Sequence, residues 1–560
     1  KDSTGITSYN YDANYQIIDI TKGGVKQLAY TYDELGNKKS ITDSKKFSTS
    51  YTYDKINRLN TINFSGKLIT YNYDNNGNNK SIVYPGGNVE NIVYDKDNRI
   101  SNIDNVIGSG KSISKSEYSY YDNSLLKSKK DNSGTTNYEY NKNGVITKVT
   151  SPENIVQYNY DLVNNRITES EINISNHPSG YIAKDGKETQ YRSEESKYLY
   201  DNNNKLISVT ENMKDDKNNN ILQKTINYYY DNNGNQLKEN SLYTDKSLNA
   251  TSVISNNTYT INQFDGFNRM KKVDITKNNS ISTSEFSYNG DDLRVKKAYK
   301  DSSVNNTTNY LFDGQDLMLE SNDKGEVQNR YIKGNKYVSK IDSTNKISYY
   351  MYNGHGDVVQ TIDEVGNVEN KYKYDSFGNL TVSEEKSYNP IRYSGEYYDN
   401  NIGLHYLKAR YYNSKIGRFI SEDSYEGEDS NPLSLNRYTY CNNEPLLNID
   451  PTGHNTCPIP MPQGGFDWEA LKPIMEGLAG GASVLLAPEV LLIGGTAALV
   501  GYLASDNYVP SHGSTMDFNF DLHSSSKPII GNMNIPKVNF SDWNFSMPNI
   551  NIPKMDFSSL

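Results

Sequence analysis

A tyrosine followed by an aspartate recurs at nearly constant spacing along the chain, and this repeat limits the folds open to it. The first five pairs are separated by 21, 21, 20 and 21 residues. Looser copies, with Asn for Asp or Phe for Tyr, continue the series to residue 375. A fixed period indicates one structural unit that stacks on its own copies. The regular pairs are Tyr11-Asp12, Tyr32-Asp33, Tyr53-Asp54, Tyr73-Asp74 and Tyr94-Asp95.

The order of residues inside each unit predicts a β-hairpin. A second tyrosine often stands two residues before the pair, as Tyr30 does before Tyr32. That spacing puts both rings on one face of a strand. A segment rich in Asn and Gly follows, as in residues 34–37 and 75–78, and these residues tolerate the positive φ of tight turns. Alternating apolar positions, as in 58–62, then predict the second strand.

The tyrosine content explains how such a polar chain can fold. Only 35% of the residues are hydrophobic, yet 49 are Tyr, whose ring buries apolar area while its hydroxyl makes hydrogen bonds. A single hairpin is marginally stable, but a row of paired hairpins buries a continuous tyrosine face. Because sheets twist, the row should curl. We therefore predict an all-β fold whose hairpins wind into a spiral, hollow shell.

The repeat resembles the YD repeat of Rhs proteins, wall-associated polymorphic toxins, insecticidal toxin-complex C subunits and teneurins. The resemblance covers residues 1–388. It implies a strip of hairpins wound into a cocoon that encloses another polypeptide, in a secreted or cell-surface, cell-wall-associated bacterial protein. Because the chain begins at Lys1 without a signal peptide, we expect it to be the C-terminal part of a longer polypeptide.

Residues 389–453 are similar to the RHS repeat-associated core domain almost from end to end. The resemblance rests on Asn-Pro-Ile-Arg-Tyr-Ser-Gly-Glu from Asn389, on Gly-Arg-Phe at 417–419 and on Asp-Pro-Thr-Gly at 450–453. It implies a domain that plugs one end of the shell. It also implies that a variable C-terminal region begins at residue 454.

In several relatives the chain cuts itself just after the Asp-Pro-x-Gly sequence, through paired aspartates. The positions that match are Asp423 and Asp450. Two carboxylates that share a proton can supply a general base and a general acid, and Arg418 would orient or neutralise either one. Relatives that cleave often carry Leu after the Gly, whereas His454 stands here. A second interpretation, in which both aspartates only cap turns, therefore stays open, and enzymatic activity is undecided.

The C-terminal region, residues 454–560, divides into an apolar segment at 471–504, predicted to be helical, and an irregular Pro- and Asn-rich tail at 505–560. Residues 477–504 are long enough to span a bilayer, but Pro488 splits them into two shorter halves. Two interpretations are open: a membrane-active hairpin, or an apolar helical pair packed inside the shell.

Charge and spacing exclude several other classes of function. The net charge is −10 and Lys and Arg form no cluster, which disfavours nucleic acid as a partner of the shell. The His and Cys residues have no metal-ligand spacing, so neither a metal nor another cofactor is predicted. Whether Cys441 and Cys457 pair, and in which redox state they stand, is left open.

The function expected from these observations is that of a polymorphic toxin used in contact-dependent competition. The shell would enclose and deliver its own C-terminal tail, a membrane-active effector in one interpretation, with a cognate immunity protein as partner. Two alternatives are a cell-surface adhesion module that binds carbohydrate through its YD repeats, and an orphan remnant without a working toxin. The target of the tail, the residues before Lys1 and the closure of the shell are not predicted.

Overall fold

The computed structural model describes residues 5–174, 180–184, 187–215, 217–245, 253–428, 431–454 and 456–458. Their regular structure is β-strand apart from four short 3-10 segments, which confirms the predicted all-β class. Among these residues, none of the helical segments has the length and apolar character needed to cross a membrane. The predictions of an apolar helical segment at 471–504 and an irregular tail at 505–560 lie outside the described residues.

One antiparallel sheet of 32 strands contains nearly the whole repeat region. Each strand pairs with the next along the chain, and the only departure is that β16 pairs with β19 because β17 and β18 form a separate hairpin. The first half comprises β1 (Thr7–Tyr11), β2 (Ile17–Lys22), β3 (Val25–Tyr32), β4 (Lys38–Asp43), β5 (Ser48–Tyr53), β6 (Leu59–Phe64), β7 (Lys67–Tyr73), β8 (Asn79–Val83), β9 (Val89–Tyr94), β10 (Ile100–Val106), β11 (Ser112–Tyr120), β12 (Leu126–Asp131), β13 (Gly134–Tyr140), β14 (Ile146–Thr150), β15 (Asn154–Tyr160) and β16 (Arg166–Asn173). 

The second half continues this meander, and the separate hairpin precedes it in the chain. The hairpin is β17 (Gly180–Lys184) and β18 (Lys187–Tyr191). The meander strands are β19 (Ser193–Tyr200), β20 (Leu206–Lys214), β21 (Asn220–Tyr230), β22 (Gln236–Asp245), β23 (Val253–Phe264), β24 (Met270–Lys277), β25 (Ser280–Tyr288), β26 (Arg294–Lys300), β27 (Asn305–Asp313), β28 (Asp316–Ser321), β29 (Val327–Lys333), β30 (Tyr337–Asp342), β31 (Ile347–Tyr352), β32 (Val358–Ile362), β33 (Val368–Tyr374) and β34 (Leu380–Glu385).

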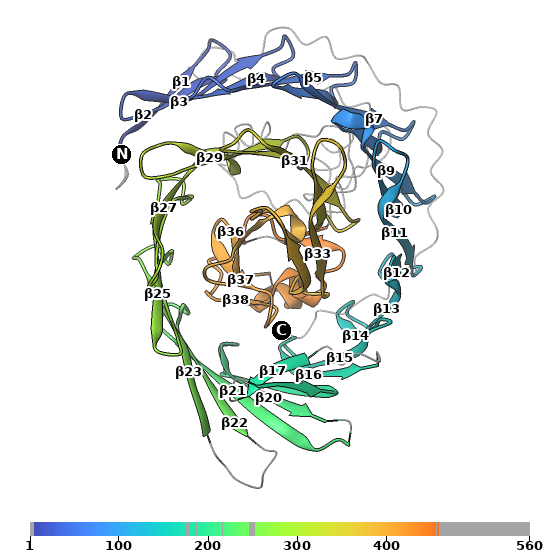
Figure 1. The fold of residues 1–560 in the computed structure, drawn as a ribbon, viewed down its shortest axis with the longest axis vertical. Coiled ribbons are helices and arrows are strands. Elements are labelled where there is room, and N and C mark those ends of the chain that lie inside the picture. The colour runs from blue at the N-terminus through green and yellow to red at the C-terminus, as the bar shows by residue number, and fades with distance from the viewer. Residues whose placement is uncertain are drawn as a thin grey trace, which may run out of the picture. The chain divides into compact units, whose positions relative to one another are not determined.

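The sheet winds as an open spiral whose last strands lie inside its first ones (Figure 1). A buried apolar cluster joins the two layers and combines residues of β3–β8 with residues of β29–β32. Ion pairs also cross between the layers: Arg330 Nε lies 2.8 Å from Asp43 Oδ2, and Lys38 Nζ lies 2.8 Å from Asp313 Oδ2. The spiral form of the prediction is thus confirmed. The two terminal strands, β1 and β34, do not pair with each other, so the sheet is not closed.

The aspartate that marks each repeat organises the turn after it. The Oδ1 atom of Asp54 accepts hydrogen bonds from the backbone N–H groups of Ile56 and Arg58, both at 3.0 Å. Between them Asn57 has φ 67°, the left-handed conformation predicted for these turns. The same two bonds recur at Asp12, Asp33, Asp74, Asp95, Asp161, Asp201, Asp231, Asp265 and Asp375.

In eight repeats the tyrosine of the pair connects its repeat to the one before. The hydroxyl of Tyr73 donates to the carbonyl oxygen of Leu59 at 2.6 Å, just after the preceding turn. Arg58 fills the space between the repeats, with one ion pair to Asp54 at 2.7 Å and its guanidinium 4.1 Å from the centre of the Tyr73 ring. The same type of bond is made by Tyr32, Tyr53, Tyr94, Tyr140, Tyr200, Tyr288 and Tyr374.

Replacing one of these tyrosines by phenylalanine should weaken the contact between two neighbouring repeats. In Tyr73→Phe the ring keeps its packing, but the bond to the Leu59 carbonyl is lost, at a cost of about 1 kcal/mol. Hydrogen exchange of the amides in β6 and β8 should become about fivefold faster. Tyr15→Phe is the control because that side chain is 89% exposed. Equal exchange in both variants would contradict a role for the hydroxyl.

After β34 the chain continues inside the wound sheet (Figure 1), and we call residues 389–453 the core plug. Its four strands are paired in chain order, and two more short strands, β39 and β40, follow. Their bounds are β35 (Tyr397–Asp399), β36 (Leu404–Leu407), β37 (Arg410–Asn413), β38 (Arg418–Phe419), β39 (Asn448–Ile449) and β40 (Cys457–Pro458). The 3-10 segments of the chain are η1 (Pro85–Gly87), η2 (Tyr393–Gly395), η3 (Pro432–Leu435) and η4 (Cys441–Asn443).

Candidate functional site

A buried ionic cluster fixes the core plug to the sheet. Arg294, the first residue of β26, is 1% exposed, and its Nη1 lies 2.8 Å from Oδ2 of Asp399 at the end of β35. Lys297 Nζ lies 2.6 Å from the other oxygen of that carboxylate. The low dielectric of the interior strengthens these bonds and makes the loss of either partner expensive.

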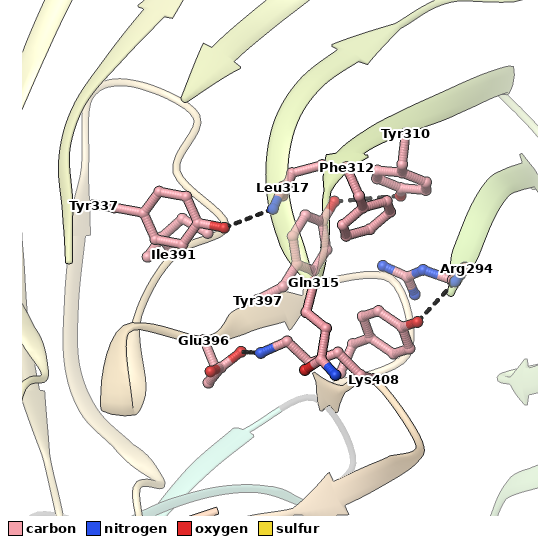
Figure 2. A pocket seen from close by; sticks show the side chains of 11 residues that line it. Arg294, Tyr310, Phe312, Gln315, Leu317, Tyr337, Ile391, Glu396, Tyr397 and Lys408 are labelled. Atoms are coloured by element: carbon pink, nitrogen blue, oxygen red, sulfur yellow. Dashed lines mark hydrogen bonds and ion pairs between the residues drawn. The ribbon is translucent and has the colours of Figure 1, made fainter. Parts of the chain in front are cut away.

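Aromatic side chains from both the sheet and the plug lie around Arg294 of this cluster (Figure 2). The hydroxyl of Tyr406 accepts a hydrogen bond from the backbone N–H of Arg294 at 2.7 Å, and the Arg294 guanidinium lies 4.5 Å from the centre of the same ring. The hydroxyls of Tyr310 and Tyr397 are 3.3 Å apart across the interface. The plug is therefore held by specific polar contacts as well as by burial.

The two aspartates predicted from the sequence both lie within ion-pair distance of one arginine, Arg410. Arg410 begins β37, and its Nη2 lies 2.5 Å from Oδ2 of Asp423 and 3.6 Å from Oδ2 of Asp450. All three side chains are at least nine-tenths buried. Burial lowers the pKa of Arg410, and the negative charges of the two aspartates oppose that effect. Two carboxyl groups and one guanidinium group therefore lie together in a space that excludes most water.

Asp450 also shapes the backbone of the Asp-Pro-Thr-Gly turn. Its Oδ1 accepts hydrogen bonds from the N–H of Gly453 at 2.8 Å and of His454 at 3.1 Å. Gly453 has φ 80°, and a Cβ there would lie 2.5 Å from the carbonyl oxygen of Leu407. Only glycine fits this position without strain.

The peptide bond between Gly453 and His454 faces this group of charges. Arg410 Nε donates to the Gly453 carbonyl oxygen, and Asp450 Oδ1 lies 3.1 Å from the nitrogen on the other side of the bond. The ring of His454 lies 2.8 Å from Asp423, Nδ1 to Oδ1. A guanidinium that polarises a carbonyl, with carboxylates beside it, is an arrangement that can assist attack on that carbonyl.

Arg418 occupies a different place from the one expected for it. Its Nη1 donates to Asn165 Oδ1 at 3.1 Å and its Nη2 donates to the carbonyl oxygen of Asn204 at 2.6 Å. It therefore ties the plug to two repeat turns, while Arg410 contacts both aspartates. None of the three motifs on which the resemblance rests contains Arg410, which lies in the Lys-Ala-Arg-Tyr-Tyr sequence at 408–412.

No group of three or more His, Cys, Asp or Glu side chains within the described ranges is arranged to hold a metal ion.

The buried His405 of the plug should make the stability of the protein depend on pH. It is 1% exposed among tyrosine rings, and burial together with the charge of Arg392 lowers its pKa to about 3. The unfolded chain binds a proton near pH 6.5 and the folded chain does not, so stability is lost as the pH falls from 6.5 towards 3. Between pH 7 and pH 5 the loss from this residue should be about 2 kcal/mol.

Urea unfolding of the full chain at pH 7 and pH 5 measures this effect. His405→Phe keeps an aromatic ring and removes the titration, so its unfolding midpoint should fall less on acidification than that of the unmodified chain. Parallel pH dependence in the two proteins would contradict the assignment.

Comparison with known proteins relates parts of this chain to a YD-repeat shell and to toxins. The family model described as teneurin YD-shell matches residues 39–177. A tRNA3(Ser)-specific nuclease WapA of Bacillus spizizenii is 35% identical over 226 residues, which are 39% of this chain and 9% of that protein. The toxin protein Tse5 of Pseudomonas aeruginosa is 32% identical over 112 residues, 19% of this chain and 8% of that protein. The chain thus spans less than a tenth of the length of either relative.

Solved structures share the same fold. A crystal structure of TcdB2-TccC3 aligns with 81% of this chain and 24% of its own at a TM-score of 0.55 and 18% identity. A Photorhabdus luminescens Tc holotoxin pore aligns with 79% of this chain and 21% of its own at a TM-score of 0.52 and 18% identity. At these identities the likeness establishes the architecture of the wound sheet.

Proposed function

We propose that this chain, which belongs to the Rhs/YD-repeat family, is the C-terminal part of a polymorphic toxin whose shell encloses and delivers a variable effector between bacteria. The observation that carries the proposal is the core plug. It lies inside the wound sheet and is fixed there by the buried contacts of Arg294, Asp399 and Arg418. Such anchoring suits a shell that must hold one end of its cargo in place.

The domain boundaries of the proposal follow the family resemblance. Residues 1–388 are the YD-repeat shell, residues 389–453 the core plug, and residues 454–560 the variable C-terminal region. The effector is the last of these, and it would leave the shell once the chain is cut after Gly453.

The cut itself is the activity that the geometry around Gly453 supports best. In the proposed step, Arg410 polarises the Gly453 carbonyl and Asp423 takes a proton from a water molecule that attacks the carbonyl carbon. Asp450 starts the step protonated, as the acid of the pair, and delivers that proton to the nitrogen of His454 as the C–N bond breaks, so that the pair ends with its one proton on Asp423. The products are a carboxylate at Gly453 and an amine at His454, so one water molecule is consumed.

Several partners belong to this proposal. The first is the chain's own tail as enclosed cargo, and the second is a cognate immunity protein that protects the producing cell. Contact with a membrane through residues 477–504, recognition of carbohydrate by the shell and attachment to the cell wall are narrower expectations from the sequence. We keep them as separate hypotheses.

The test is to purify the full chain and follow it over days. Denaturing gels should show two polypeptides, 1–453 and 454–560, which elute together under native conditions. The enclosed tail should resist a protease that digests it rapidly after the shell is unfolded. A single polypeptide after prolonged incubation would contradict self-cleavage, and rapid digestion of the tail in the native protein would contradict enclosure.

A further inference from the structure

The only two cysteines of the 560-residue chain stand on opposite sides of Gly453. Cys441 precedes it and Cys457 follows it, and no disulfide joins the two in the structure. A break after Gly453 would therefore place one cysteine on each product. In a chain otherwise without cysteine, this placement is informative, because a bond between the two would be the only covalent link across the break.

The fold brings the two cysteines to the same part of the plug. After Gly453 the chain turns back, and β40 pairs with β39 so that Cys457 lies opposite Ile449. Ile449 is followed by Asp450, whose charge acts on both thiols. Burial first, and the negative charge of Asp450 next, raise the pKa of Cys441 and of Cys457.

A shared cavity adds a geometric reason to pair them. Cys441 and Pro458, the residue next to Cys457, line the same pocket between the plug and the sheet. Cys441 is 1% exposed and has φ 50°, an uncommon backbone conformation for a residue other than glycine. Three consecutive residues, 441–443, adopt this left-handed conformation and present the cysteine at the edge of the pocket.

We propose that Cys441 and Cys457 form a disulfide that spans the Gly453–His454 junction and keeps the tail attached to the plug after the chain is cut. The attachment function rests on the proposed self-cleavage, whereas the disulfide does not depend on it. Without the bond, the cut tail would be held next to the junction by the two residue pairs of β39 and β40. With it, release would require reduction.

The chemistry balances with a small organic disulfide as oxidant. Each cysteine thiol loses a proton, the two sulfur atoms join, and the two electrons reduce the oxidant to two thiols. Thiols in the cytosol of a target cell would reverse the reaction and free the tail. Because the pKa of both cysteines is raised, the thiolate is scarce at neutral pH, so formation should be slow there and faster under alkaline conditions.

The disulfide is tested first in full-length Asp450→Asn protein, which should remain uncut. The protein is treated with hydroxyethyl disulfide at alkaline pH, alkylated and digested with chymotrypsin, which can cut after Tyr440, Leu447 and Phe466. Peptides 441–447 and 448–466 should then be found joined, with a mass two hydrogen atoms below their sum. Alkylation of both cysteines, or a separate adduct of the oxidant on each, would overturn the proposal.

The tether is tested in the oxidised protein with an intact Asp450. On a non-reducing denaturing gel the tail should stay with the rest of the chain, and a reducing agent should release it. Cys457→Ser should release the tail on both gels. Release of the tail from the oxidised parent on the non-reducing gel would overturn the tether. One band on both gels, together with joined peptides, would instead refute self-cleavage and leave the disulfide standing.

Discussion

Asp450→Asn should abolish the cut between Gly453 and His454 while leaving the turn around it folded. Asparagine keeps the Oδ1 acceptor for the N–H groups of Gly453 and His454, but it carries no charge and cannot hold the proton that the leaving nitrogen needs. General acid and base groups contribute about 10²–10⁴-fold to rates of this kind. The expected result is a slowing of that order, measured by intact mass over days.

The substitution separates the two interpretations that the sequence leaves open. If Asp450 acts only as a turn cap, Asn should cut as the parent does and Ala should disturb the turn. If it moves a proton, both variants should stay uncut. Asp423→Asn should slow the reaction by a similar factor, because its carboxylate would no longer accept the proton from water.

A matched control comes from the repeats. Asp363 accepts hydrogen bonds from the backbone N–H groups of Val365 and Asn367, so it caps a turn as Asp450 does, but it lies in a repeat turn after β32. Asp363→Asn should therefore cut at the parent rate. Loss of cutting in this variant would indicate that the assay reports general misfolding.

Arg410→Lys examines the third member of the site. Lysine keeps a positive charge, but it cannot bond Asp423 and the Gly453 carbonyl in the planar geometry of a guanidinium. Arg418→Lys is the informative comparison because Arg418 contacts Asn165 and Asn204 instead. Equal slowing in both variants would argue that the arginines act through the stability of the plug.

The hairpins could be predicted from the sequence because their signal is local. The bonds that Asp54 makes reach only two and four residues ahead, so the whole turn is visible in one repeat. The winding was predicted only in outline. Contacts between the layers, such as that of Lys38 with Asp313, join residues 275 positions apart and follow no repeated pattern.

The same dependence on tertiary contacts explains why the sequence indicated Arg418, and not Arg410, as the arginine beside the aspartates. Arg410 and Arg418 are alike in the sequence. Each begins a short strand of the plug, and each directly precedes an aromatic residue, Tyr411 or Phe419. Which one faces the aspartates depends on how β37 and β38 pair and on which repeat turns lie beside them. That information comes from the tertiary structure and cannot be read from the local sequence. The aspartates were easier to identify, since their motifs mark them directly.

Breaking the ionic cluster between the sheet and the plug should have the largest effect on stability. Asp399→Ala leaves Arg294 and Lys297 buried without the carboxylate that lies between them. Removal of one partner from a buried ion pair costs about 3–5 kcal/mol because the remaining charge stays desolvated. The plug should loosen first, so hydrogen exchange in β35–β37 should accelerate by more than a hundredfold, well before β3–β8 are affected.

Two comparisons make this prediction specific. Glu117→Gln removes a carboxylate that pairs with Lys115 at 2.7 Å on the surface, where the Glu117 side chain is 42% exposed, and should cost less than about 1 kcal/mol. Replacing the whole cluster by apolar residues, in Arg294→Met with Lys297→Met and Asp399→Leu, should recover much of the loss, because no charge is left buried. If the triple variant is as unstable as Asp399→Ala, the aromatic packing around Arg294 holds the plug, and the ion pairs do not.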